Sequence, residues 1–347
     1  MEVGGGPLVE RRRDPLTGQW RTFATHRQNR TFLPAEGECP LCPTRPTGAI
    51  TEIPEPSYDI VVFDNRFPSF MAHPPDPEVA STALYPVAPA AGAAEVVVYA
   101  DSHDLTMSDL GPERIARIVE VWADRYAELG RRQEVGYVFI FENKGIVIGV
   151  TLSHPHGQIY GYPQIPPLAL VELEAAKAHL GTYGTCVVCD IVARERSEGV
   201  RVVARNRTFL AYVPFAARFP YEIHVTAHRH AASLLDLSEP ERADLAELID
   251  TVVRGYDALF DFSLPYVMAI HQAPTDDGGW EAVSHFHIEF TPVHRAPDKL
   301  KYLAGSELAA GAFITDLAPE HTADELRRAV QRCANLESST NLERTIR

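Results

Sequence analysis

The sequence predicts a duplicated α+β fold, and three observations support this prediction. Predicted strands are mixed with a few long helices, without the regular strand–helix alternation of a parallel α/β sheet. The same order of features occurs twice along the chain, which is rarely a product of chance. The 347 residues are also enough for two domains of ordinary size. We expect these domains to span residues 1–180 and 181–347.

The first copy of the repeated unit begins at a Cys-x-x-Cys pair and ends at a His-x-His motif. It contains, in chain order, Cys39 and Cys42, Asn65, a strand at 94–100, His103, a helix from about 111 to 129, a strand at 137–141, and His154 and His156. Pro112 suits the first turn of that helix, where its missing N–H costs nothing. Ile115, Ile118 and Trp122 then recur at helical spacing and predict a face that packs on the core.

The second copy repeats this order. It contains Cys186 and Cys189, Asn206, a strand at 221–227, His230, a helix from about 239 to 259, a strand at 266–270, and His285 and His287. We expect the linker between the copies near 181–185, after a helix around 170–180. A further helix is expected to begin at Thr322, where Thr-Ala-Asp-Glu reads as a capping box.

Composition excludes several classes of function. The net charge of −15 argues against nucleic-acid binding, which needs clustered Lys and Arg. A few local arginines can still bind a small anion against this overall field. The longest apolar runs are strand-sized, well short of the roughly 20 residues of a membrane-spanning helix. The first fifteen residues lack the apolar core of a secretory signal. We therefore expect a cytoplasmic protein that binds neither nucleic acid nor membranes.

The two Cys-x-x-Cys pairs predict two structural metal sites. A structural zinc site takes four ligands in a tetrahedron, and each pair supplies two thiolates from one tight turn. Later histidines complete two candidate sets, which are Cys39, Cys42, His103 and His154, and Cys186, Cys189, His230 and His285. A redox role is disfavoured because no thioredoxin-like βαβ context surrounds either pair. Cysteines without a metal beside ordinary core histidines are the remaining alternative.

The segment from Ser153 to Tyr160 carries the candidate catalytic residues. In an extended strand alternate side chains share a face, so we expect His154, His156 and Gln158 to lie side by side. A neutral imidazole is a nucleophile near pH 7, and an amide can donate to a phosphate oxygen without adding charge. Phosphoryl transfer through a loose transition state depends mainly on such positioning. The second copy has Glu289 where Gln158 stands, so we expect only the first copy to be catalytic.

The run HPHGQ, preceded by FENKG and followed by Ile-Tyr, resembles the active-site signature of the galactose-1-phosphate uridylyltransferase family. This family belongs to the histidine-triad superfamily, and the likeness covers about Trp20 to Leu326. The resemblance implies a duplicated histidine-triad-like fold with two antiparallel sheets and flanking helices, usually as a homodimer. It also implies ping-pong transfer of UMP from UDP-glucose to galactose 1-phosphate through a uridylyl-histidine.

The resemblance assigns roles to individual residues. It makes His156 the nucleophile and Gln158 a contact of the transferred phosphate. It assigns phosphate binding to Arg27 and Arg30, nucleotide binding to Asn65, Asn143, Gly149 and Thr151, and binding of the hexose and its phosphate to Lys301, Tyr302 and Glu307. Phe313 stands where many members have a Gln that contacts the hexose.

Alternatives remain for the second metal site and for the function. Some family members bind iron through a Glu and three histidines, and the matching residues are Glu172, His271, His285 and His287. We favour the cysteine set and zinc, because thiolates prefer zinc. An ADP-glucose phosphorylase that moves AMP to phosphate is a second function on the same fold. A zinc-stabilised nucleotide-binding protein without catalysis is a third.

Overall fold

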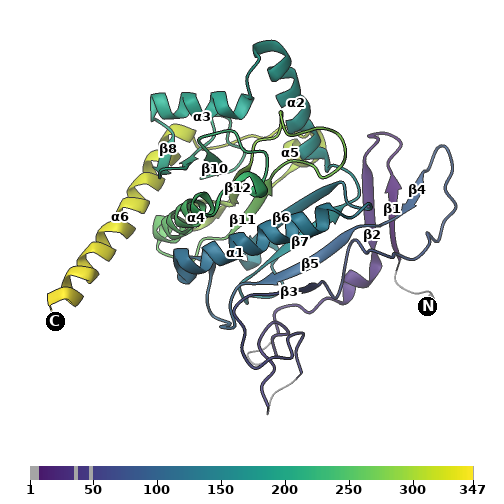
Figure 1. The fold of residues 1–347 in the computed structure, drawn as a ribbon, viewed down its shortest axis with the longest axis horizontal. Coiled ribbons are helices and arrows are strands. Elements are labelled where there is room, and N and C mark those ends of the chain that lie inside the picture. The colour runs from purple at the N-terminus through teal and green to yellow at the C-terminus, as the bar shows by residue number, and fades with distance from the viewer. Residues whose placement is uncertain (1–7, 35–37, 47–49, 347) are drawn as a thin grey trace.

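A nine-stranded antiparallel sheet forms the centre of the molecule (Figure 1). The computed structural model describes residues 8–34, 38–46 and 50–346. The strands follow the order β3-β5-β7-β6-β11-β12-β10-β9-β8 across the sheet. Their bounds are β3 Val61–Asp64, β5 Ala93–Val98, β6 Tyr137–Lys144, β7 His156–Tyr162, β8 Val202–Arg205, β9 Phe209–Tyr212, β10 Ile223–Ala227, β11 Tyr266–His271 and β12 His287–Pro292.

The strand order itself contains the predicted duplication. The unit β3-β5-β7-β6 of the first half corresponds to β9-β10-β12-β11 of the second half, in reverse order across the sheet. The α+β class with antiparallel strands and flanking helices is confirmed. The two expected sheets are, however, joined into one, because β6 pairs with β11 from Lys144 and Tyr266 to Ile140 and Ile270. This pairing satisfies the backbone groups that each half would otherwise expose at a sheet edge.

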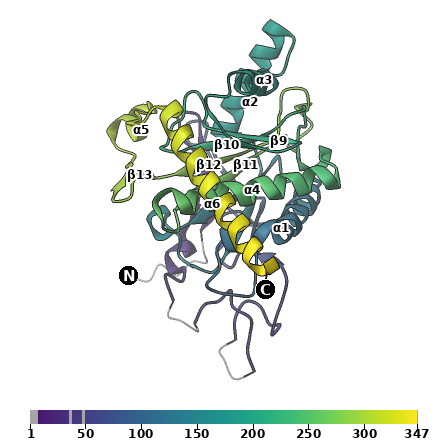
Figure 2. The same cartoon turned by 90° about the vertical axis from the view of Figure 1, so that its left-hand side faces the viewer.

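Two long helices cover one face of the sheet and pack against each other (Figure 1). They are α1 Met107–Gly130 and α4 Glu239–Phe260. The apolar stripe predicted for α1 is confirmed, since Ile115, Ile118 and Trp122 are fully buried, and Ile249 of α4 is fully buried as well. A third helix, α6 Pro319–Ile346, crosses α4 and contacts β8 (Figure 2). No helix in the described part of the chain combines the length and apolar character needed to cross a bilayer.

The remaining elements surround this core. A three-stranded sheet has the order β2-β1-β4, and two short strands form a separate ribbon. The bounds are β1 Val9–Arg13, β2 Trp20–Ala24, β4 Val87–Pro89, β13 His294–Ala296 and β14 Lys299–Leu300, with 3₁₀ turns η1 Thr25–Asn29, η2 Ile146–Ile148 and η3 Leu234–Asp236. The shorter helices are α2 Pro167–Tyr183, α3 Val187–Glu198 and α5 Gly305–Ala310.

Two predicted helix boundaries need correction, and one is confirmed with an addition. The long segment of α1 begins after Gly111 as expected, because Gly111 is non-helical with φ 73°, and a short turn from Met107, capped by Thr106 and Asp109, precedes it. Helix α6 begins at Pro319, so Thr322 lies inside its first turn and donates its hydroxyl to the Pro319 carbonyl at 3.1 Å. The linker expected over 181–185 starts within α2, and the expected division at residues 180 and 181 therefore falls inside a helix.

Candidate active site

His156 and Gln158 line one cavity, which we call the His156 cavity. Both side chains are partly exposed on one face of β7, whereas Gly157 between them is buried. Four other predicted residues line the same cavity, namely Arg27, Arg30, Asn65 and Thr151. The fold thus brings a candidate nucleophile, an amide and two guanidinium groups together at the start of one strand.

His154 does not share this face as the sequence suggested. The strand expected over 153–160 begins only at His156, and His154 lies just before it. Its ring is buried, with Nδ1 3.6 Å from the Sγ of Cys42. Alternate side chains therefore share a face for His156 and Gln158, but His154 precedes the strand and lies outside this pattern.

The environment of His156 favours a neutral ring with Nε2 free to react. Nδ1 lies 2.7 Å from the carbonyl oxygen of His154, so this nitrogen is the protonated donor. Burial lowers the pKa of His156, and the bond to the His154 carbonyl only partly offsets this. At neutral pH the ring therefore carries one proton, on Nδ1, and its Nε2 lone pair is available.

The neighbours of Gln158 orient its amide. Its Oε1 accepts from the amide of Asn65 at 3.5 Å and from the hydroxyl of Tyr160 at 3.3 Å. Its NH₂ group is thereby left as a donor toward the cavity. Arg27 is fixed beside it, because Nη1 donates to the carbonyl oxygen of Phe67 at 2.9 Å. The site therefore presents donors, which suit phosphate oxygens.

The four predicted ligands of the first metal site come together. One ligand atom from each of Cys39, Cys42, His103 and His154 lies within 4.8 Å of the others. The Sγ of Cys42 is 3.5 Å from Nδ1 of His103 and 3.6 Å from Nδ1 of His154. Zinc–sulfur and zinc–nitrogen bonds of ordinary length place tetrahedral S and N ligands about 3.5 Å apart, so the spacing fits a zinc ion.

Outer contacts fix these histidines with Nδ1 toward the sulfurs. Nε2 of His154 lies 2.7 Å from the carbonyl oxygen of Ala100, and Nε2 of His103 lies 3.1 Å from the hydroxyl of Ser153. A metal-binding histidine usually donates its other N–H to such a partner, which sets the tautomer. The arrangement is the one expected of a metal site.

The second half repeats this arrangement with Cys186, Cys189, His230 and His285, whose ligand atoms also lie within 4.8 Å of one another. Nδ1 of His285 is 3.6 Å from Sγ of Cys186 and 3.5 Å from Sγ of Cys189. Its Nε2 lies 3.2 Å from the carbonyl oxygen of Ala227, as His154 does with Ala100. The residues of both predicted sites are therefore suited to a metal ion of the same kind.

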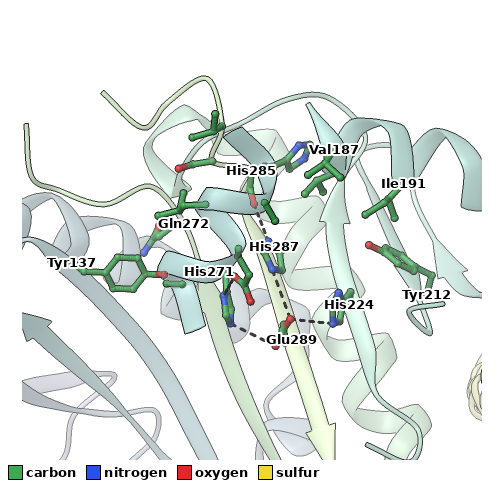
Figure 3. Close-up of a pocket in the computed structure, with 18 residues that line it drawn as sticks. Tyr137, Val187, Ile191, Tyr212, His224, His271, Gln272, His285, His287 and Glu289 are labelled. Atoms are coloured by element: carbon green, nitrogen blue, oxygen red, sulfur yellow. Dashed lines mark hydrogen bonds and ion pairs between the residues drawn. The ribbon is translucent and has the colours of Figure 1, made fainter. Parts of the chain in front are cut away.

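The alternative set for the second site is divided by the fold. The ligand atoms of Glu172, His271 and His287 lie within 4.8 Å of one another, whereas Nδ1 of His285 faces the cysteine sulfurs. The rings of His271, His285 and His287 all line one pocket with Glu289 (Figure 3). Nδ1 of His271 lies 2.8 Å from a carboxylate oxygen of Glu172. Burial alone would lower the pKa of His224 there, but Glu289 and Glu222 raise it to about 9. This pocket is a network of buried charges rather than a copy of the His156 cavity.

Comparison with known proteins places the chain in a family. Residues 7–166 match the family model described as galactose-1-phosphate uridyl transferase, N-terminal domain, and residues 172–340 match the corresponding C-terminal domain. The chain belongs to the galactose-1-phosphate uridylyltransferase family. The family resemblance inferred from the HPHGQ run is therefore confirmed.

Relatives and solved structures agree with this assignment. The galactose-1-phosphate uridylyltransferase of Thermotoga maritima is 38% identical over 92% of this chain and 98% of its own. That of Streptomyces lividans is 35% identical over 92% and 86%. A solved uridylyltransferase structure is 35% identical, with a TM-score of 0.83, over 93% of this chain and 99% of its own. An ADP-glucose phosphorylase from Arabidopsis thaliana, 23% identical with a TM-score of 0.70, shares the fold.

In this member of the uridylyltransferase family, the residues expected to hold the hexose do not line the His156 cavity. Lys301 and Glu307 pair with each other at 3.2 Å, and the Lys301 ammonium also donates to the carbonyl of Ile314. The side chain of Tyr302 is 75% exposed, and Phe313 packs on Phe219 with ring centroids 5.8 Å apart. Glu307 is part of α5, the helix labelled in Figure 1, and its pairing with Lys301 lies apart from the His156 cavity.

Two further predicted nucleotide residues also lie outside the cavity lining. Asn143 is on β6, paired with Val267 of β11. Gly149 ends η2 with φ 87°, a left-handed conformation that glycine adopts without strain. The assignment of Asn143 and Gly149 to the nucleotide stays a prediction.

Sequence reasoning missed two residues of this family member's site. The Tyr58 hydroxyl lies 3.0 Å from Nε2 of His154, 2.8 Å from the Leu41 carbonyl and 2.9 Å from the Ala100 carbonyl. Glu52 lines the His156 cavity. Both residues lie in loops outside any helical or strand periodicity, and only the folded chain brings them to the site.

Proposed function

We propose that this nucleotidyltransferase moves UMP from UDP-glucose to galactose 1-phosphate through a uridylyl group carried on Nε2 of His156. One observation carries the proposal. His156 lines a cavity together with Gln158, Arg27 and Arg30, and its Nδ1 lies 2.7 Å from the His154 carbonyl oxygen, which leaves Nε2 as the reactive nitrogen. Burial lowers the pKa of this ring, which favours its neutral form. This combination suits attack on a phosphorus atom whose oxygens need donors.

The reaction is a pair of displacements at the same phosphorus. The Nε2 lone pair attacks the α-phosphorus of UDP-glucose, the bond to the bridging oxygen breaks, and glucose 1-phosphate leaves with that electron pair. A phosphate oxygen of galactose 1-phosphate then attacks, the N–P bond breaks, and UDP-galactose leaves. The ring is positively charged in the intermediate, and the His154 carbonyl stabilises it by accepting from Nδ1–H at 2.7 Å.

We assign supporting roles to the other cavity residues. Gln158 donates its NH₂ to a non-bridging oxygen of the transferred phosphate. Arg27 and Arg30 neutralise the diphosphate, and their planar groups suit bidentate contacts. Asn65 orients Gln158, and Thr151 contacts the nucleotide.

We propose that a homodimer supplies the acceptor contacts, because Lys301, Tyr302 and Glu307 do not line the His156 cavity of their own chain. Mixed dimers test this arrangement. Variants His156→Ala and Lys301→Ala are each expected to be inactive alone. Co-expressed, they should regain up to about a quarter of the activity, because mixed dimers then contain one intact site. No recovery in a confirmed mixed dimer would contradict shared sites.

We propose that both cysteine clusters bind Zn²⁺ as structural ions, since each donor set is complete with four protein ligands. Burial, followed by the neighbouring Cys39, raises the pKa of Cys42 to about 11, so a divalent cation is what would hold both sulfurs as thiolates at neutral pH. Reduced thiols also support a cytoplasmic location. Elemental analysis should find about two zinc ions per chain.

Double labelling tests the covalent step. UDP-glucose carrying ³²P in the α-phosphate and ³H in the glucose is mixed with the protein and quenched. The proposal predicts acid-labile ³²P on the protein and free ³H-glucose 1-phosphate. His156→Ala should remain unlabelled, whereas His73→Ala, which removes an exposed histidine, should label normally. Loss of both labels together would exclude the intermediate.

The same assay separates the alternative functions. The rate of transfer from ADP-glucose to inorganic phosphate is compared with the rate from UDP-glucose to galactose 1-phosphate. If the first is faster, the protein is an adenylyltransferase. A chain that binds UDP-glucose without labelling, and whose His156→Ala variant keeps that affinity, would be a non-catalytic binding protein.

A further inference from the structure

Glu52 is the only acid among the described residues that line the His156 cavity. Three arginines, Arg27, Arg30 and Arg66, line the same cavity. A carboxylate in a cavity suited to a phosphate anion is costly unless it faces a donor. The donors that surround Glu52 therefore indicate which part of a ligand it can face.

The fold holds Glu52 in place from two sides. Its backbone N–H donates to the Pro40 carbonyl at 3.0 Å, so the loop that carries Glu52 is attached to the turn between Cys39 and Cys42. Its Oε1 accepts from Nη1 of Arg66 at 2.9 Å. The guanidinium of Arg66 in turn lies over the ring of Phe67, with its Cζ 5.7 Å from the ring centroid, within the distance at which a cation is attracted to a ring face.

The second carboxylate oxygen of Glu52 has no hydrogen-bond partner among the described residues. The Glu52 side chain is 30% exposed and that of Arg66 is 67% exposed, which places the pair at the rim of the cavity with one oxygen free to accept. Phosphate groups offer no donor to this oxygen and are repelled by it. The oxygen therefore suits an O–H or N–H donor of the ligand, and the nucleoside is the donor-bearing part that stays at the site in the proposed uridylyl intermediate.

The chemistry of a nucleoside narrows the choice. The α-phosphorus belongs beside His156, and the apolar walls formed by Leu41, Phe63 and Val96 suit the flat faces of a base. The donors of a nucleoside are the N–H groups of its base and the vicinal 2′- and 3′-hydroxyls of its ribose. Of these, only the vicinal hydroxyls form a pair from which one carboxylate can accept two hydrogen bonds together in every ribonucleotide. Arg66 offsets the charge of Glu52 and fixes the plane of its carboxylate.

We propose that Glu52, held by Arg66, accepts hydrogen bonds from the ribose hydroxyls and makes this cavity selective for ribonucleotides over 2′-deoxyribonucleotides. The inference rests on the proposed function, since it assumes a nucleotide with its phosphate at His156. It adds a selectivity that the transfer reaction itself does not require.

Binding of UMP and of 2′-deoxy-UMP, measured by titration calorimetry, tests the proposal without any catalytic step. Wild type should bind UMP about ten- to a hundredfold more tightly, the range expected for a hydrogen bond to a charged group at a partly exposed site. The AMP and 2′-deoxy-AMP pair is run in parallel, so that base preference does not obscure the sugar effect. A wild-type preference below about threefold would overturn the proposal.

Variants of Glu52 and Arg66 then test whether this ion pair causes the preference for ribose over deoxyribose. Glu52→Gln should lower the ribose preference to below about threefold, and Arg66→Gln should lower it partly by freeing the carboxylate. Glu55→Gln removes an exposed charge from the same segment and should leave the preference unchanged. An unchanged preference in Glu52→Gln would refute the assignment. If that variant fails to fold, Arg66→Gln decides in the same way.

The labelling experiment separates this inference from the proposed function. A protein that labels on His156 but binds UMP and 2′-deoxy-UMP equally would retain the transferase function and lose the role of Glu52. A protein that discriminates between the two sugars but never labels would retain the role of Glu52 and lose the covalent mechanism.

Discussion

A single added methyl group at Gly157 should disable the site, because Tyr99 lies directly behind β7. A Cβ built on Gly157 would lie 2.0 Å from the Tyr99 hydroxyl oxygen, 3.0 Å from its Cζ and 3.2 Å from the Phe141 carbonyl oxygen. Tyr99 is fully buried, and its ring packs edge-on against Trp122, so it has no room to swing away. In Gly157→Ala the strand itself must move.

The size of the effect follows from this overlap. Ordinary contact between carbon and oxygen needs about 3.4 Å or more, so β7 must shift by more than about 1 Å. Overpacking of this kind costs about 1–3 kcal/mol of unfolding free energy. Gly157 lies between His156 and Gln158, and a misplacement of about 1 Å at reacting groups can slow a reaction about a hundredfold. The labelling rate of Gly157→Ala should therefore fall by more than its smaller folded fraction would explain.

A rescue experiment checks the cause. The Tyr99 hydroxyl is buried beside the side chains of Glu142 and Trp122, so Tyr99→Phe is also measured alone as the reference for the double variant. Combined with Gly157→Ala it removes the closest contact and should restore most of the stability and rate. Urea unfolding and rapid-quench labelling measure the two quantities. Gly181→Ala is the matched control, since its added methyl meets nothing within 4 Å. Wild-type behaviour of Gly157→Ala, or no rescue by Tyr99→Phe, would refute the reasoning.

Three other predictions concern the buried charges and the metal clusters. Burial raises the pKa of Glu142 to about 7, above its usual 4.5, so the folded state binds the extra proton and the unfolding free energy falls as pH rises through this window. Glu142→Gln cannot lose this proton, so its unfolding free energy, measured by urea titration, should rise relative to wild type by up to about 3 kcal/mol between pH 4.5 and 8. The same dependence of unfolding free energy on pH in variant and wild type would contradict this. Cys42→Ser should raise KM for UDP-glucose severalfold, because the turn it anchors holds Leu41 and Glu52 in the cavity wall. Cys186→Ser should lose one zinc and some thermal stability while labelling at the wild-type rate, and equal effects of the two variants on KM would count against this separation. Tyr58→Phe should weaken zinc binding at the first cluster about tenfold or more in chelator competition, since its hydroxyl contacts Nε2 of His154; unchanged affinity would show that the Ala100 carbonyl suffices.

Much of the fold was predictable because its signals are local or repeated. The apolar spacing of Ile115, Ile118 and Trp122 predicted α1, and the duplicated order of features anticipated two units with the same strand order. The pairing of β6 with β11, which joins the two units, has no such signal. The two strands meet edge to edge, and this contact does not change which of their residues are buried. The alternation of apolar and polar residues is therefore the same whether or not the two strands pair.

The site was predictable where one short segment determines it. The Cys-x-x-Cys pairs and the histidines that follow come together as expected, since their chemistry restricts their partners. The contributions of Glu52 and Tyr58 could not be predicted, because loops without periodicity bring them to the site. The grouping of Lys301 with Glu307 away from His156 could not be predicted either, since a motif gives a residue's type but not which cavity it lines.

The second half contains a histidine, His287, that matches His156 in position, and comparing their surroundings shows how the two halves differ. Nδ1 of His287 lies 2.8 Å from the His285 carbonyl, matching the 2.7 Å contact of His156, so orientation of the ring is not the difference. Glu289 replaces Gln158, and its carboxylate lies 3.9 Å from Nε2 of His287, where it repels an incoming phosphate. The ring of His271 also stacks on His287, with centroids 4.8 Å apart. Because both halves hold the histidine alike, the difference between them lies in its neighbours, where the first half has the Gln158 amide and the second half has the Glu289 carboxylate.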